Sequence, residues 1–222
     1  MNLLAARGRF DEALAEGVRA RALDPLSVTT CAIVGWVLIF MRDYERAVQE
    51  LRTPLEMDPT WVLGHLWSAW PKFQLGQQDE AIVGLEKAMA LWGNTSYTRA
   101  HLALGLAVAG REGQARLALA ALREMSSTRY VSSVLLAMIE TALGDRDAAF
   151  VCLQQALRDR DHWLVYLDVD SRFDPLRGEP RFEALRRSVG LAPDASSPPA
   201  AGLTESTAIT TPHPNSARPG AN

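Results

Sequence analysis

Apolar residues recur along residues 1–158 three or four positions apart, which is the spacing of one face of an α-helix. Leu102 and Leu106 follow this spacing in one segment, and Leu122 and Met125 follow it in the next. No segment shows the sustained alternation of apolar and polar residues that indicates half-buried strands. The pattern therefore predicts an all-α chain.

A short motif also recurs at an interval of about 34 residues. Its clearest marker is an alanine that follows a turn and acidic residues, found at Ala13, Ala47, Ala81, Ala115 and Ala148. Consecutive marker alanines are 34, 34, 34 and 33 residues apart. Repeats of this length are typical of stacked helical hairpins, each of which buries its apolar side against its neighbours. The sequence predicts about five such hairpins.

Glycine, proline and acidic residues mark the expected ends of these helices. Four repeats carry a glycine at the turn between their two helices: Gly8, Gly76, Gly110 and Gly144. Glycine adopts the left-handed conformation of such turns readily. Asp79 and Glu80 follow one of these turns, and acidic residues favour the first turn of a helix. Pro25 and Pro59 are 34 residues apart, and we expect each to end a second helix.

The repeated pattern resembles the tetratricopeptide repeat family over about residues 1–158. The second unit matches best, with Gly35 in the first helix, Tyr44 at the end of the turn, Ala47 in the second helix and Pro59 at its end. The resemblance implies a right-handed α-solenoid of about five helix-turn-helix repeats. The expected repeats are 1–25, 28–59, 60–93, 95–128 and 129–158.

Two prolines fall inside helices that the repeat predicts. Pro54 lies in the second helix of the second unit, and Pro71 lies in the first helix of the third unit. An interior proline costs a helix about 3 kcal/mol because it removes a hydrogen bond and clashes with the preceding turn. We expect kinks at both positions.

A different pattern follows the repeats, beginning with Trp163 and ending near residue 191. Residues 159–191 resemble the segment that follows such arrays in bacterial multidomain regulators. Physically, they predict a cap over the last apolar face, because a solenoid needs a cover at its end. The expected elements are a short helix near 162–168, a turn at Asp174-Pro175 and a last helix at 180–189. Residues 192–222 hold six of the twelve prolines and no aromatic residue, so they predict a disordered tail.

The beginning of the chain contains only about half of the first unit's leading helix, because Met1 falls near its middle. A helix of that length is marginal alone. We expect the chain to be the C-terminal part of a longer polypeptide, or else a partner to cover this face. Self-association through the incomplete first repeat is also plausible.

Charge and cysteine content exclude some classes of partner. The chain has 23 Lys and Arg against 26 Asp and Glu, so it lacks the basic excess of a nucleic-acid-binding protein. Two cysteines, Cys31 and Cys152, favour a reducing compartment over a disulfide framework. The longest apolar run, from residue 31 to residue 41, is too short to span a membrane. We therefore expect a cytoplasmic protein with neither nucleic-acid nor membrane partners.

The sequence shows no catalytic motif: no glycine-rich phosphate loop, zinc-protease helix or nucleophile elbow. An acidic run begins at Asp168 and has the rough spacing of a calcium loop, but Arg172 and Phe173 stand where that loop needs an oxygen ligand and a glycine. His101 and Cys152 have no sequence feature that brings them together. We expect no enzyme activity, no cofactor and no metal.

Aromatic residues suggest a binding surface instead. Trp36 and Trp70 are 34 residues apart, at the same position of successive first helices, and in the resembled family that helix lines a concave groove. The expected partner-binding residues are Trp36, Phe40, Leu66, Trp70, Phe73 and Tyr97. The alternative is that these residues pack between helices, as we expect for Trp67 and Trp92. Ala32 and Leu66 stand where charged grooves carry basic residues, so the groove favours an apolar peptide or helix.

These observations predict a non-catalytic protein–protein interaction module that presents a concave, aromatic-lined groove to a protein or peptide with an apolar segment. An alternative is the C-terminal regulatory or sensory part of a bacterial kinase, transcription regulator or cyclase-like protein. A third is an enzyme with a site in the cap, using His162, Asp168 and Asp170, but no acid–base or nucleophile pattern supports it.

Overall fold

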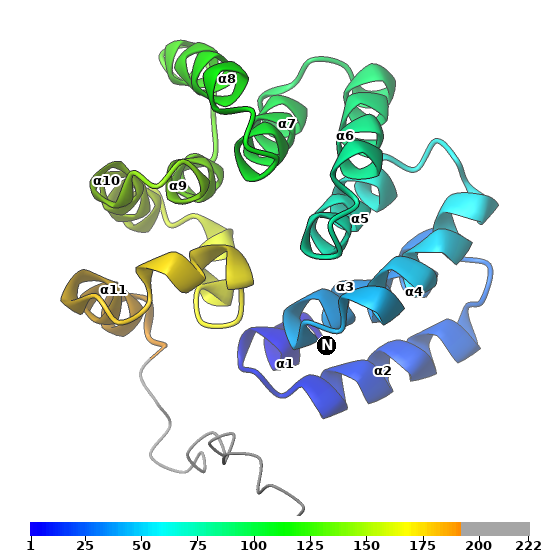
Figure 1. The fold of residues 1–222 in the computed structure, drawn as a ribbon. Coiled ribbons are helices and arrows are strands. Elements are labelled where there is room, and N and C mark those ends of the chain that lie inside the picture. Colours follow the sequence, from blue (N-terminus) through cyan, green and yellow to red (C-terminus); the bar gives the residue numbers. More distant parts are fainter. Residues whose placement is uncertain (192–222) are drawn as a thin grey trace, which may run out of the picture. The chain divides into compact units, whose positions relative to one another are not determined.

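The computed structural model describes residues 1–191, and the expected disordered tail at 192–222 lies outside the described residues. Residues 1–191 consist of helices joined by short turns, with no strand among them (Figure 1). The predicted all-α class is confirmed. None of the helices in this part of the chain is long and apolar enough to cross a membrane.

The first ten helices pair into five hairpins, and each hairpin packs against the next one along the chain. The hairpins are α1 (Asn2–Ala6) with α2 (Phe10–Leu23), α3 (Val28–Met41) with α4 (Tyr44–Met57), α5 (Val62–Gln74) with α6 (Gln78–Trp92), α7 (Ser96–Val108) with α8 (Glu112–Met125), and α9 (Ser133–Ala142) with α10 (Arg146–Arg158). The predicted solenoid of about five hairpins is therefore confirmed.

The turn within a hairpin uses a residue in the left-handed conformation. In four hairpins this residue is a glycine with φ between +70° and +81°, as predicted: Gly8, Gly76, Gly110 and Gly144. The second hairpin has no glycine there, and Arg42 takes the left-handed conformation with φ of +63°. The turn geometry is thus common to all five hairpins even where the glycine is missing.

The marker alanines lie where the two helices of a hairpin meet. In the first four hairpins they are at most 1% exposed: Ala13, Ala47, Ala81 and Ala115. In the fifth hairpin the fully buried residue is Ala149, while Ala148 is partly exposed, so the choice of Ala148 was wrong. Ala149 lies five residues after Gly144, as Ala115 does after Gly110, and it makes the interval 34 residues throughout.

The two interior prolines do not interrupt their helices. α4 continues through Pro54 to Met57, and α5 continues through Pro71 to Gln74. Each proline lies three residues before the last residue of its helix, so few backbone hydrogen bonds follow it. The carbonyls of both prolines still accept hydrogen bonds, from the amides of Asp58 and Leu75.

After α10 the chain forms two 3₁₀ helices, η1 (His162–Tyr166) and η2 (Ser171–Leu176), and then α11 (Pro180–Val189). The final helix has the bounds that the sequence predicts, but the expected helix near 162–168 is a five-residue 3₁₀ helix. Leu167, Phe173 and Leu176 are at most 1% exposed and join the apolar cluster of the last hairpins. These elements cap the array as predicted.

The hairpins are arranged so that their first helices form an inner face. α3, α5, α7 and α9 contact one another in sequence, whereas the second helices contact the first helix of the next hairpin. In Figure 1, α5, α7 and α9 lie accordingly inside α6, α8 and α10. η1 contacts α1 and η2 contacts α9, so the segment after the last hairpin also lies on this inner side.

Candidate functional site

The inner face brings the expected binding residues together. α3 supplies Trp36 and Phe40, α5 supplies Leu66, Trp70 and Phe73, and α7 supplies Tyr97. All except Phe73 line one central cavity of about 50 Å³. Phe73 lines a smaller adjoining cavity together with Leu66 and Trp70. Partner binding at these positions stays a prediction.

Burial divides these six residues into two groups. Trp36 and Phe40 are only 8% and 6% exposed, and Leu66 and Phe73 are buried to a similar degree. Trp70 and Tyr97 are partly exposed. The first group therefore also fills space between helices, which was the alternative reading, and the second group keeps surface that a partner can contact.

A segment of the same chain covers the α3 part of the inner face. We call residues 162–176, which comprise η1 and η2, the closing segment. The ring of Tyr166 stacks on Phe40 with centroids 5.2 Å apart and planes 9° apart. The same ring meets Trp36 edge-on, with centroids 5.3 Å apart. Offset and edge-on pairs of this kind stabilise the contact beyond the apolar area that they bury.

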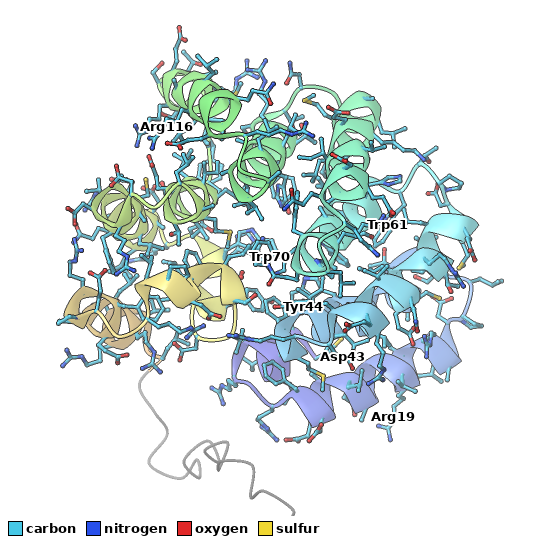
Figure 2. The ribbon with its side chains drawn as sticks, viewed as in Figure 1. Arg19, Asp43, Tyr44, Trp61, Trp70 and Arg116 are labelled. Atoms are coloured by element: carbon cyan, nitrogen blue, oxygen red, sulfur yellow. The ribbon has the colours of Figure 1, made fainter. Side chains whose placement is uncertain are left out.

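Polar contacts hold the closing segment beside the second and third hairpins. The hydroxyl oxygen of Ser171 accepts hydrogen bonds from Trp70 Nε1 at 3.0 Å and from the Tyr44 hydroxyl at 3.2 Å. Arg42 forms an ion pair with Asp174, with an N–O distance of 2.7 Å. Trp70 accordingly points from α5 toward this segment, and Tyr44 lies nearby at the start of α4 (Figure 2).

Arg172 of the closing segment brings a charge to the central cavity, and Asp170 balances it. The guanidinium donates two hydrogen bonds to the Asp170 carboxylate, at 2.8 and 2.5 Å, and both side chains are largely buried. Burial alone lowers the pKa of Arg172, but Asp170 outweighs this effect and raises the pKa. The same guanidinium lies 5.9 Å from the ring centroid of Trp70.

His101 and Tyr97 are two titratable groups of α7 that line this cavity, and His101 has the larger pKa shift. Burial lowers its pKa to about 4, and the nearby Arg172 charge acts in the same direction. Its Nδ1 lies 2.9 Å from the carbonyl oxygen of Tyr97. Because a carbonyl only accepts, Nδ1 carries the proton of the neutral ring and Nε2 remains an acceptor. Burial also raises the pKa of the Tyr97 hydroxyl.

The wall of the central cavity is mainly aromatic and aliphatic. Its ionisable groups are the neutral His101, Tyr97 and the paired Arg172, and no carboxylate or thiol is among the lining residues. Within residues 1–191, no cluster of three potential metal ligands occurs.

The other candidates from the sequence lie apart from the cavity or are already paired. Asp168 pairs with Arg186, so the acidic run of the cap is held by arginines. The Cys152 thiol lies near Glu140 and Arg123, and burial raises its pKa. Trp92 is 51% exposed, so the expectation that it fills space between helices was wrong.

The sequence analysis missed the residues that the closing segment contributes. Tyr166 and Trp163 are aromatic residues three positions apart on η1, and this spacing was a signal that they share a face. Trp163 lines the central cavity, while Tyr166 packs on Phe40. Nothing in the spacing indicates that this face meets hairpins more than a hundred residues earlier.

No family model and no curated protein matches this chain. Among solved structures, the chain is similar to the crystal structure of MamA protein. The two chains are 20% identical, the similarity covers 73% of this chain and 89% of that chain, and the TM-score is 0.47. A likeness at this level supports no conclusion about function, and the hairpin fold rests on the helices and contacts of this chain alone.

Proposed function

We propose that this chain is a non-catalytic protein-interaction module, a helical repeat scaffold whose inner face binds an apolar segment of a partner protein. The observation that carries the proposal is that this face already holds a polypeptide segment, residues 162–176. The ring of Tyr166 stacks on Phe40, and the Trp70 indole donates a hydrogen bond to that segment. Aromatic side chains with one polar group are frequent anchors of protein interfaces.

The central cavity is too small for an organic ligand or a partner segment while the closing segment is in place. A volume of about 50 Å³ accommodates a few waters, whereas sites for small organic ligands occupy roughly 300–1,000 Å³. A partner segment can therefore contact Trp36 and Phe40 of the inner face only when the closing segment separates from the first hairpins. Hairpin arrays permit such a movement because each repeat contacts only its neighbours.

The contacts of the closing segment indicate which features a partner needs. An aromatic or large apolar side chain would replace Tyr166 on Phe40, and an oxygen acceptor would replace Ser171 at Trp70 Nε1. Arg172 and its partner Asp170 leave with the closing segment, and the α3 and α5 residues that line the cavity carry no charge. We therefore expect a partner segment that is apolar and near neutral.

The test compares two tryptophans that differ in location. Trp70→Ala removes the partly exposed inner-face indole, and Trp92→Ala removes an exposed indole on α6, outside the cavity wall. Labelled apolar peptides with an aromatic residue are titrated against each variant, and binding is followed by fluorescence anisotropy. We expect Trp70→Ala to weaken binding tenfold or more, as loss of an interface anchor does, and Trp92→Ala to leave it unchanged.

Equal binding by the two variants, or no peptide binding by the folded parent, would contradict the proposal. Circular dichroism confirms that each variant retains its helices. Trp36→Ala is less suitable, because truncating a buried tryptophan costs about 3–5 kcal/mol and confounds binding with unfolding.

A further inference from the structure

The chain makes a sharp turn between the last hairpin and the closing segment. Arg160 has φ of +54°, in the left-handed region that is unfavourable for residues other than glycine. The turn is closed by the amide of Asp161, which donates a hydrogen bond to the carbonyl of Ala156 at 2.9 Å. The Arg160 side chain is exposed, so no burial compensates for this conformation.

Apart from Asp161, whose carboxylate caps η1, the local sequence carries no signal for a turn at this point. Glycine and proline, the residues that usually end helices, are absent from residues 146–174. Four of the turns within hairpins have a glycine at the left-handed position, so their reversal is encoded locally. Residues 146–168 can instead form one continuous helix, in which Arg160 has ordinary helical dihedral angles.

The segment beyond the turn needs a surface on which to pack. Its buried apolar residues are Leu167, Phe173, Leu176 and Phe182. They belong to the apolar cluster that α9 and α10 share. On its other side, Tyr166 packs on α3 and Ser171 accepts hydrogen bonds from α4 and α5. A second copy of this chain offers both of these surfaces in the same arrangement.

We infer that two copies of this chain exchange residues 162–191, so that the closing segment and α11 of each copy pack on the hairpins of the other. α10 then continues through residues 159–161 as a longer helix. The contacts of Tyr166 with Phe40 and of Ser171 with Trp70 form between two chains instead of within one. Exchange keeps the contacts of residues 162–191 with the hairpins, although the longer helix gives up the hydrogen bonds that Ser132 and Tyr130 donate to Asp161. A short strained turn favours exchange.

The order in which contacts form explains when exchange occurs. Ser171 meets Trp70 across 101 positions of sequence, and Arg42 meets Asp174 across 132 positions. Such distant contacts form after the local hairpins, because closing a long loop costs more entropy. At high protein concentration, the closing segment of another copy competes at this late step. This inference does not rest on the binding of a different protein to the inner face.

The first test uses two substitutions at the turn of the full-length chain. Arg160→Gly relaxes the left-handed conformation, while Arg160→Ala keeps the strain and favours the helix. Both remove the same charge. Each variant and the parent are refolded from urea at low and high protein concentration. Light scattering then measures the molar mass of the refolded species. We expect a dimer fraction that rises with concentration and is about tenfold larger for Arg160→Ala than for Arg160→Gly.

The second test asks whether the dimer is built by exchange. Arg42→Glu in one chain and Asp174→Arg in another each place like charges together within a closed monomer. When the two chains are refolded together, exchange matches both charge pairs, so we expect more mixed dimer than either variant forms alone. Monomers at every concentration, equal dimer fractions for the two Arg160 variants, or no preference for the mixed dimer would overturn the inference.

Discussion

His101 lies on the inner face, and burial there keeps its imidazole ring neutral. Its Nδ1 donates a hydrogen bond to the carbonyl of Tyr97, and its pKa is lowered to about 4 by burial and by the nearby charge of Arg172. An exposed histidine in the unfolded chain has a pKa near 6.5. The unfolded chain therefore takes up a proton at a pH where the folded protein does not.

Acid should destabilise the protein through this residue. The favourable contribution is fully present above pH 6.5 and is lost as the pH falls toward 4, because the folded-state pKa is the lower one. Over that window we expect the free energy of unfolding of the parent to fall by up to roughly 3 kcal/mol relative to His101→Gln. Urea unfolding followed by circular dichroism at a series of pH values measures this difference.

A comparison with His162→Gln controls for the loss of a histidine as such, because His162 is exposed on the closing segment. Carboxylates that titrate in the same window are common to all three proteins and cancel in the comparison. Parallel profiles for the parent and His101→Gln would contradict the expected role of burial at this position.

At the scale of helices, local signals explain why most boundaries could be predicted. The carboxylates of Asp43 and Asp145 accept hydrogen bonds from backbone amides at the starts of α4 and α10, and such caps are visible in the sequence. η1 differs because Asp161 accepts a hydrogen bond from the amide only two positions later, on Trp163. The same carboxylate also accepts a hydrogen bond from the hydroxyl of Tyr130, which lies between α8 and α9. The local sequence does not predict this tertiary contact.

Glycines inside helices provide a test of how closely the helices pack. A Cβ atom at Gly35 of α3 would lie 2.7 Å from Cγ of Leu51, which is fully buried on α4 and has little room to move. A Cβ atom at Gly84 of α6 would meet no atom closer than 3.7 Å. The same substitution should therefore have opposite effects at the two sites.

We expect Gly35→Ala to destabilise the protein by about 1–3 kcal/mol through overpacking. Gly84→Ala should stabilise it by about 0.5–1 kcal/mol, because alanine lowers the entropy cost of forming the helix. Urea unfolding at neutral pH measures both values. Since the change in the unfolded chain is alike for both, a stabilising Gly35→Ala would show that α3 and α4 are less closely packed than the structure indicates.

At the scale of the whole described unit, the sequence predicts one side of the inner face and misses the other. Trp36 and Trp70 could be placed on a shared face because a 34-residue period repeats the same helix position. Tyr166, Ser171 and Arg172 could not, because their contacts depend on how several hairpins curve together. Helical periodicity fixes which face of a helix is apolar but not which distant segment covers that face.

Closure of the inner face should be detectable as local protection of α3. Tyr166→Ala removes the ring that stacks on Phe40 and covers Trp36, while the backbone of η1 keeps its Asp161 cap. We expect amide hydrogen exchange to become faster in α3 and α5, whose inner surfaces the ring helps to cover, and to stay unchanged in α8. The free energy of opening the inner face around α3 should fall by up to about 3 kcal/mol, the cost of a buried aromatic truncation.

Val165→Ala is the matched control, because Val165 lies beside Tyr166 on η1 and is 41% exposed. This substitution truncates a side chain of the same 3₁₀ helix without uncovering Phe40. Hydrogen exchange in α3 should therefore match that of the parent. If Tyr166→Ala instead speeds exchange evenly through all five hairpins, the ring stabilises the array globally. If exchange in α3 does not change, the closing segment does not protect the inner face in solution, and the contact between Tyr166 and Phe40 contributes little to closure.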